Sequence, residues 1–122
     1  MRESHCNHTL HETKEIENII QSTPSVHKLN KLAEFFKAFS DPTRLKIIRA
    51  LSQRELCVCQ IAEITNMSQS AVSHQLKYLK SIDVVSNRRD GKSIIYSISD
   101  THISHIYGEG LIHINEEDNS HE

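Results

Sequence analysis

The chain of 122 residues is predicted to form a mainly α-helical fold with one two-stranded β-hairpin. Two observations carry this prediction. Apolar residues between Thr13 and Ser81 recur mostly at the three- and four-residue spacing of amphipathic helices. Residues 84–88 and 93–98, in contrast, are rich in β-branched side chains and flank a turn that contains Asp90-Gly91, a favoured hairpin dipeptide. With 37% hydrophobic and 25% charged residues, the composition fits one small globular domain.

Three helices are expected before residue 55. A weakly amphipathic helix covers about 13–22 and ends before Pro24. A second covers 27–39, where the apolar stripe consists of Leu29, Leu32, Ala33, Phe36 and Phe39. Asp41 is a good N-cap and Pro42 suits the first helical position, so a core helix begins there. Its apolar face consists of Leu45, Ile47, Ile48 and Leu51.

Two further helices and a turn are predicted over residues 55–81. Glu55–Ile64 is expected to be a short helix, followed by a turn at residues 65–67. Ser68 caps the next helix, whose apolar members are Ala71, Val72, Leu76 and Leu79. After the hairpin, a last helix begins near Ser99. Its apolar residues are expected to pack on the core or on a partner: Ile103, Ile106, Tyr107, Leu111 and Ile114.

Basic residues are concentrated around the capped helix and the hairpin, although the formal net charge of the chain is -2. A helix, a turn, a polar helix and a basic hairpin together predict a winged helix-turn-helix. Candidates for hydrogen bonds to base edges are Gln69, Ser70, Ser73, His74 and Gln75. Candidates for phosphate contacts are Lys77, Arg88, Arg89 and Lys92. The plainer alternative is a polar helix face that is merely solvated.

The last helix carries two pairs of potential metal ligands, Asp100 with His102 and His113 with Glu116. The two histidines are eleven residues apart, which places them on one stripe but about 16 Å apart along the axis. No single ion spans that distance, because zinc holds its ligands at about 2 Å. Antiparallel pairing of two copies of the helix would bring all four residue types together. The sequence therefore predicts a homodimer with two symmetric metal sites.

A second group of potential ligands consists of Cys57, Cys59 and the N-terminal Cys6. Three thiolates would suit Cd(II), Pb(II) or Zn(II). Residues two apart in a regular helix point about 200° from each other. Joint chelation by Cys57 and Cys59 therefore requires a helix start or a distorted turn, and the alternative is ordinary buried cysteine. His5, His8 or His11 is a possible nitrogen ligand that completes the site.

The chain resembles the ArsR/SmtB family of metal-sensing transcriptional repressors from about Leu29 to Glu116. The motifs that carry the resemblance are Asp41-Pro42-Thr43-Arg44, Glu55-Leu56-Cys57-Val58-Cys59 and Ser70-Ala71-Val72-Ser73-His74-Gln75-Leu76. The resemblance implies a dimeric winged helix whose metal-free form occupies an operator and is released by metal. It also implies that metal-resistance or efflux genes are controlled.

The family pattern extends to both ligand groups. Zinc-sensing members carry Asp-x-His and His-x-x-Glu on the C-terminal helix, which Asp100, His102, His113 and Glu116 match. In that precedent the residue at His113 also bonds backbone near the end of the DNA-binding helix. The cadmium- and lead-sensing member is similar in its Cys-x-Cys segment and in its arm cysteines. This chain lacks the second arm cysteine, since Leu10 stands four residues after Cys6.

The expected organisation is a flexible metal-binding arm (1–12), a winged-helix DNA-binding and dimerisation domain (13–117) and a disordered tail (118–122). A cytoplasmic location is expected, because no segment has the length of a membrane span or a signal-peptide core. With three glycines and no evident nucleophile pair, the chain is not expected to be an enzyme or to need an organic cofactor. A metal buffer protein and a thiol-redox-responsive repressor remain alternatives. The physiological metal among Zn(II), Cd(II), Pb(II) and Co(II), and the site that regulates, stay open.

Overall fold

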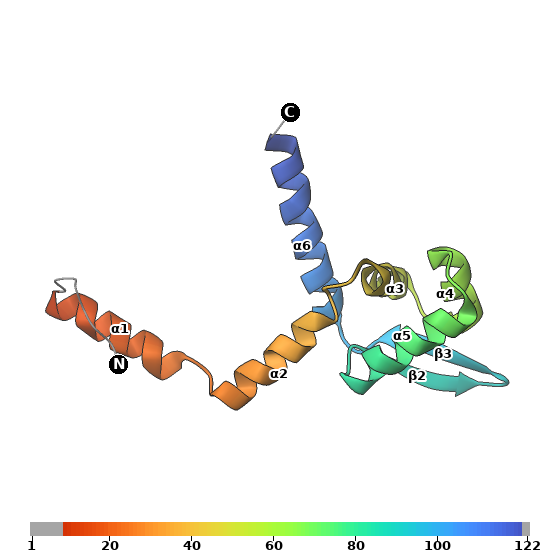
Figure 1. Ribbon diagram of the computed structural model, residues 1–122, viewed down its shortest axis with the longest axis horizontal. Coiled ribbons are helices and arrows are strands. Elements are labelled where there is room, and N and C mark those ends of the chain that lie inside the picture. The colour runs from red at the N-terminus through yellow and green to blue at the C-terminus, as the bar shows by residue number, and fades with distance from the viewer. Residues whose placement is uncertain (1–8, 121–122) are drawn as a thin grey trace. The chain divides into compact units, whose positions relative to one another are not determined.

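The computed structural model describes residues 9–120 of the protein, and Figure 1 shows their arrangement into helices and strands. In chain order the elements are α1 (Leu10–Ser22), α2 (Val26–Lys37), α3 (Pro42–Gln53), β1 (Leu56–Cys57), α4 (Val58–Thr65), α5 (Gln69–Ser81), β2 (Val85–Asp90), β3 (Ser93–Ile98) and α6 (Thr101–Ser120). The chain divides into two compact units between Leu32 and Ala33. None of the helices in this range is long and apolar enough to cross a membrane.

In the first unit, α1 begins three residues before the predicted start at Thr13. The reason is a capping box at Thr9, which the sequence-based prediction missed. The Thr9 hydroxyl accepts a hydrogen bond from the backbone N–H of Glu12, and the Glu12 carboxylate accepts one from the N–H of Thr9, both at 3.1 Å. The helix ends before Pro24, as predicted.

The apolar stripe predicted on the second helix is helical but not buried. Leu29, Leu32 and Phe36 remain 39%, 45% and 48% exposed. The helix ends at Lys37, two residues before the predicted end, because the chain turns through Ala38–Ser40. Phe39, the last residue of the predicted stripe, follows the helix and is half-buried against the core, so only the part of the stripe on α2 itself is exposed.

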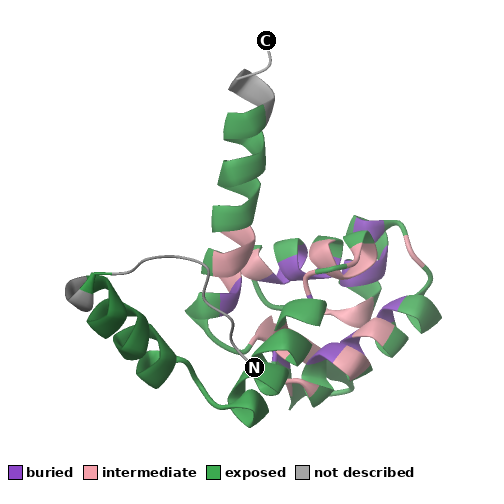
Figure 2. Ribbon diagram, turned by 60° about the vertical axis from the view of Figure 1, so that its left-hand side comes forward, coloured by how far each residue is buried: buried purple, intermediate pink, exposed green. Residues whose placement is uncertain are grey.

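The core of the second unit is built on α3, α4, α5 and the first turns of α6, as the purple segments in Figure 2 show. Asp41 caps α3 as predicted, since its carboxylate accepts the N–H of Arg44 at 3.1 Å, and Pro42 is the first helical residue. The largest completely buried side chains include Ile47, Ile48, Ile61, Leu76, Leu79 and Ile103. The predicted core of α3 is therefore confirmed at Ile47, Ile48 and Leu51, and Leu45 is half-buried.

A sharp turn joins α4 to α5 and completes the helix-turn-helix. Asn66 adopts the left-handed conformation (φ 56°, ψ 42°) that ends α4, and Met67 N–H returns to the carbonyl of Ala62. Ser68 then caps α5 by accepting the N–H of Ala71 at 3.1 Å, as predicted. The assignment of Ala71 to the buried face was wrong, because only Val72, Leu76 and Leu79 of α5 are buried.

The wing is a hairpin of β2 and β3 in antiparallel register from Val85 opposite Ile98 to Asp90 opposite Ser93. Gly91, with φ of 62°, supplies the positive φ that the tight turn requires. The prediction of a two-stranded sheet was incomplete. Leu56 and Cys57 pair with Tyr96 and Ile95 of β3, giving the strand order β1-β3-β2. For the same reason the predicted helix at Glu55 begins only at Val58.

Polar contacts attach α5 to its neighbours on two sides. The Arg44 guanidinium donates to the carbonyls of Lys37 (2.8 Å) and Ala38 (3.3 Å) and lies 4.9 Å from the centroid of the Tyr78 ring. At the other end of α5, Lys80 Nζ donates to Asn87 Oδ1 of β2 at 3.0 Å. The α5 helix and the wing are therefore held to α3 as one body.

The α6 helix is packed at its start and uncovered at its end. Ile103 is buried, Ile106 and Tyr107 are half-buried, and the Ser104 hydroxyl donates to Ser52 of α3 at 3.3 Å. From Leu111 onward the apolar side chains are exposed, with Ile112 at 51% and Ile114 at 54%. In Figure 1 this half of α6 extends away from α3, α4 and α5. Beside it lies an apolar depression of about 360 Å³ that reaches Phe39 and Leu45.

Candidate functional site

The outward face of α5 carries the side chains predicted to read DNA. Gln69, Ser70, Ser73, His74 and Lys77 are exposed, whereas the apolar side of the helix is buried. Gln75 differs from the other candidates because it is half-buried beside the apolar stripe. Four short polar side chains and one cation on an exposed helix are suited to hydrogen bonds with base edges and phosphates.

The cations of the wing differ in their surroundings. Arg88 forms an ion pair with Glu55, in which Nε and Nη2 each lie 3.3 Å from a carboxylate oxygen. The hydrogen bond to Glu55 and the charge of this carboxylate raise the pKa of the Arg88 guanidinium. Arg89 and Lys92 are exposed, with no ion pair among the residues that the structure describes. The Glu55–Arg88 pair was missed by the sequence-based prediction, since its members are 33 residues apart.

Cys57 and Cys59 lie where β1 passes into α4. Cys57 is the N-cap residue, and its backbone N–H donates to the Gln60 side chain at 3.0 Å. Cys59 is the second residue of the helix. This is the helix-start placement that joint chelation requires, because the N-cap backbone is extended (φ -88°, ψ 169°) rather than helical. Both thiols are free, and both line an open depression of about 270 Å³ together with Ser93 and Ile94.

Several predicted arm ligands lie outside the described residues. Cys6, His5 and His8 belong to this group, and the side chain of His11 is likewise not described. Of the predicted thiolate ligands, the structure describes only Cys57 and Cys59, at the start of α4.

Three of the four predicted C-terminal ligands, His102, His113 and Glu116, lie on one continuous helix, and the fourth, Asp100, lies just before it. Asp100 directly precedes α6, and its Oδ1 accepts the backbone N–H of His102 at 2.8 Å. The same oxygen lies 3.0 Å from Nδ1 of the His102 ring, so this pair is already assembled. His102 is 86% exposed. His113 and Glu116 are exposed one turn apart near the far end of α6.

No three potential ligands converge within the part of the single chain that is described. For the C-terminal pairs this follows from helix geometry, since eleven residues of α6 separate the histidines by about 16 Å. The pairs lie on one stripe and both face solvent. Each site needs ligands from beyond these residues of one chain.

Known proteins are similar to this chain in both sequence and fold. Residues 41–87 match the family described as "Bacterial regulatory protein, arsR family". A transcriptional repressor SmtB homolog of Synechocystis sp. is 38% identical over 113 residues, covering 93% of this chain and 86% of that protein. A cadmium resistance transcriptional regulatory protein CadC homolog of Staphylococcus aureus is 40% identical over 83 residues, covering 67% and 69%.

A solved structure agrees with the architecture. The homodimeric winged helix-turn-helix DNA-binding domain of a possible ArsR-family regulator from Mycobacterium bovis superimposes with a TM-score of 0.70 at 29% identity. The alignment covers 83% of this chain and 95% of that one. These similarities agree with the helix-turn-helix and the wing described above. The chain belongs to the ArsR/SmtB family of metal-sensing transcriptional repressors, which are winged-helix regulators and not enzymes.

Proposed function

We propose that the protein is a cytoplasmic, metal-responsive repressor whose metal-free homodimer binds double-stranded operator DNA and leaves it on binding Zn(II), Cd(II), Pb(II) or a similar ion. One observation carries the proposal. The helix that bears both ligand pairs is packed by its first turns against the unit that holds α5 and the wing. A shift in the position of α6 therefore shifts the surface formed by α5 and the wing, which is the surface proposed to contact DNA.

The proposed dimer contact uses the uncovered half of α6. The exposed Leu111 and Ile114 of this helix line the apolar depression beside Leu45. Full burial of one such side chain stabilises an assembly by about 1.5–3 kcal/mol. Antiparallel pairing of two α6 helices would cover this apolar surface and bring Asp100 and His102 of one copy to His113 and Glu116 of the other.

The resulting site has two imidazole nitrogens and two carboxylates, a donor set that suits Zn(II) and also accepts Co(II). The existing contact between His102 and Asp100 reduces the conformational freedom that metal binding must remove. The thiolate site is the second proposed sensor. It consists of Cys57 and Cys59 at the start of α4 with Cys6 from the N-terminal arm, and three thiolates favour Cd(II) or Pb(II).

Release follows from the two-fold arrangement. A winged-helix dimer reads two half-sites, so the separation and tilt of the two α5 helices decide its affinity. Because Arg44 contacts Tyr78 of α5 and Lys80 of α5 contacts Asn87 of β2, we expect α3, α5 and the wing to move together within each protomer. Metal that holds the two α6 helices in one arrangement opposes DNA binding if that arrangement misaligns the two α5 helices. The expected coupling free energy between metal binding and DNA binding is about 1–3 kcal/mol.

For DNA binding, Arg89→Gln is expected to weaken operator affinity for all sequences and to lower the salt slope by about 0.9, the value for one phosphate contact. Arg88→Gln is the matched variant and should lower the slope less, because Glu55 already neutralises part of its charge. Fluorescence anisotropy of labelled upstream DNA at several salt concentrations measures both. Equal slopes for the two variants would contradict the assignment.

For the dimer, Ile114→Glu is expected to raise the dissociation constant of the dimer by about tenfold or more, since a charge cannot be buried against the partner's apolar surface. Ile112→Glu is the control. It has nearly the same exposure but points about 160° away around the helix and does not line the apolar depression. Sedimentation equilibrium measures the effect, and equal dissociation of the two variants would exclude this face as the contact.

For the C-terminal sensor, His113→Gln is expected to leave operator affinity unchanged in chelator and to abolish the drop of about 5–150-fold on adding Zn(II). His105→Gln, an exposed histidine of the same helix outside the ligand pairs, should retain the drop. Anisotropy titrations of the DNA-bound dimer measure both. Zinc-driven release that survives in His113→Gln would assign regulation to the thiolate site, and release by an oxidant in chelator would favour a redox switch.

For the thiolate sensor, Cys59→Ser is expected to remove most of the ultraviolet thiolate-to-metal absorption on adding Cd(II), because it breaks the Cys57–Cys59 chelate. Cys6→Ser should remove only a part of the band. A Cd(II) titration followed by absorption spectroscopy measures the loss, and a full band in Cys59→Ser would reject the thiolate site.

A further inference from the structure

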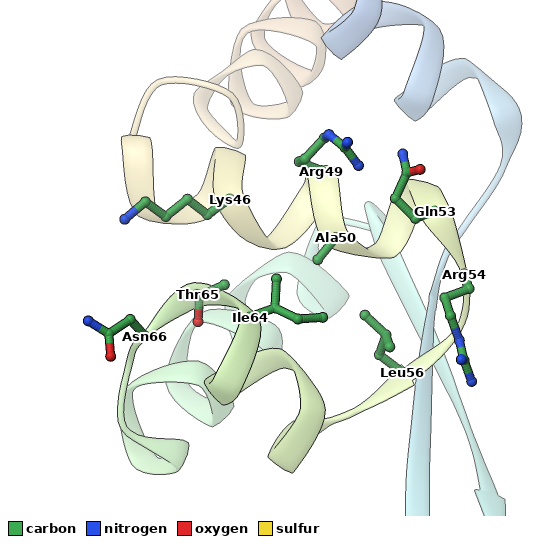
Figure 3. A pocket seen from close by; sticks show the side chains of 9 residues that line it. All are labelled: Lys46, Arg49, Ala50, Gln53, Arg54, Leu56, Ile64, Thr65 and Asn66. Atoms are coloured by element: carbon green, nitrogen blue, oxygen red, sulfur yellow. The ribbon is translucent and has the colours of Figure 1, made fainter.

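A groove between α3 and α4 is not used by the reading helix, the wing or the metal ligands. It has a volume of about 620 Å³ and is drawn from close by in Figure 3. Side chains of α3 form one wall and the end of α4 forms the other, with β1 closing one end. The lining residues include none from α5, β2, β3 or α6.

One wall of the groove is cationic. Lys46 and Arg49 are exposed on successive turns of α3, and Arg54 follows the end of that helix. Lys46 and Arg49 have no ion pair among the residues that the structure describes, and Arg54 donates only to the neighbouring carbonyl of Glu55 at 3.2 Å. No aspartate or glutamate lines the groove. Its charges are therefore uncompensated within the groove.

The opposite wall consists of Ile64, Thr65 and Asn66, of which Ile64 is apolar and incompletely covered. Ile64 is 59% exposed although Ala50 and Leu56 beside the groove are 6% and 4% exposed. An isoleucine in this position exposes apolar surface that a ligand would remove from water. The groove therefore combines exposed apolar surface on Ile64 with unpaired cations on α3, which matches a ligand that is apolar along its body and anionic at its end.

From this charge and shape we propose that the groove binds a free amphiphilic organic anion, with an acyl or aryl body on Ile64 and Ala50 and a carboxylate bound by a cation of the α3 wall. The volume lies within the range of small-molecule sites, about 300–1,000 Å³, and such sites are mostly apolar with a few placed polar groups. Lys46 and Gln53 mark the ends of a row about 10 Å long on α3. Because the groove uses no residue of α5 or the wing, the ligand and the operator bind together.

The test is a titration of the full-length, metal-free protein with sodium decanoate below its micelle-forming concentration, followed by amide chemical shifts. Saturable shifts are expected at Ala50, Ile64 and Thr65. Arg49→Glu should weaken this binding by about tenfold or more, the loss expected for a charge-assisted hydrogen bond. Lys31→Glu, which reverses an exposed cation of α2, should bind as the wild type does.

Three outcomes would overturn the proposal. The first is the absence of saturable shifts at the groove, or shifts centred instead on the purely apolar depression at Phe39 and Ile114. The second is loss of the shifts when operator DNA is added, which would assign the cations to the phosphate backbone. The third is binding to vesicles of phosphatidylcholine and phosphatidylglycerol without binding of monomeric decanoate. None of these measurements depends on metal-driven release, so the proposed sensor function is tested separately.

Discussion

The burial of the first turns of α6 against α3 is the contact on which the rest of the arrangement depends. Ile103 lies in the core and Ser104 contacts Ser52, so the start of α6 is fixed relative to α3 in the unit that contains α5 and the wing. A helix of twenty residues is about 30 Å long, far more than this contact covers. The remaining length carries His113 and Glu116 beyond the core, where no further ligand from the described residues joins them. One helix thus joins the body that reads DNA to the proposed metal ligands.

The reading unit is small, and a few polar contacts set its internal geometry. Arg44 connects the turn after α2, the start of α3 and the ring of Tyr78 in α5. Lys80 and Arg88 attach the wing from two sides, one to α5 and the other to the segment before Cys57. An exposed ion pair such as Arg88–Glu55 stabilises a fold only slightly. The two contacts matter for orientation, because each restricts how the wing moves relative to the rest of the unit.

The two proposed sensor sites differ in how they reach the reading surface. The α6 ligands act through the relative placement of two protomers, whereas Cys57 and Cys59 lie at the junction of β1 and α4, directly before the helix-turn-helix. Cys57 pairs with Ile95 in the wing sheet, so the proposed thiolate site is directly connected to the wing of the same protomer. The groove between α3 and α4 lies apart from both routes.

The sequence by itself determined the features that depend on neighbours along the chain. The Asp41-Pro42 and Ser68 caps, the Asp90-Gly91 turn, the buried stripes of α3 and α5 and the helical spacing of the C-terminal ligands are all local, because each needs only a few consecutive residues. Tertiary structure decided the features formed by distant residues. Pairing with β3 made Leu56–Cys57 a strand where local propensity predicted a helix, and it thereby placed the two cysteines at a helix start. The Glu55–Arg88 pair, the exposure of Ala71 and the cationic groove likewise arise from segments that meet only in the folded chain. Their energies depend on contacts between segments, and no spacing within one segment records them.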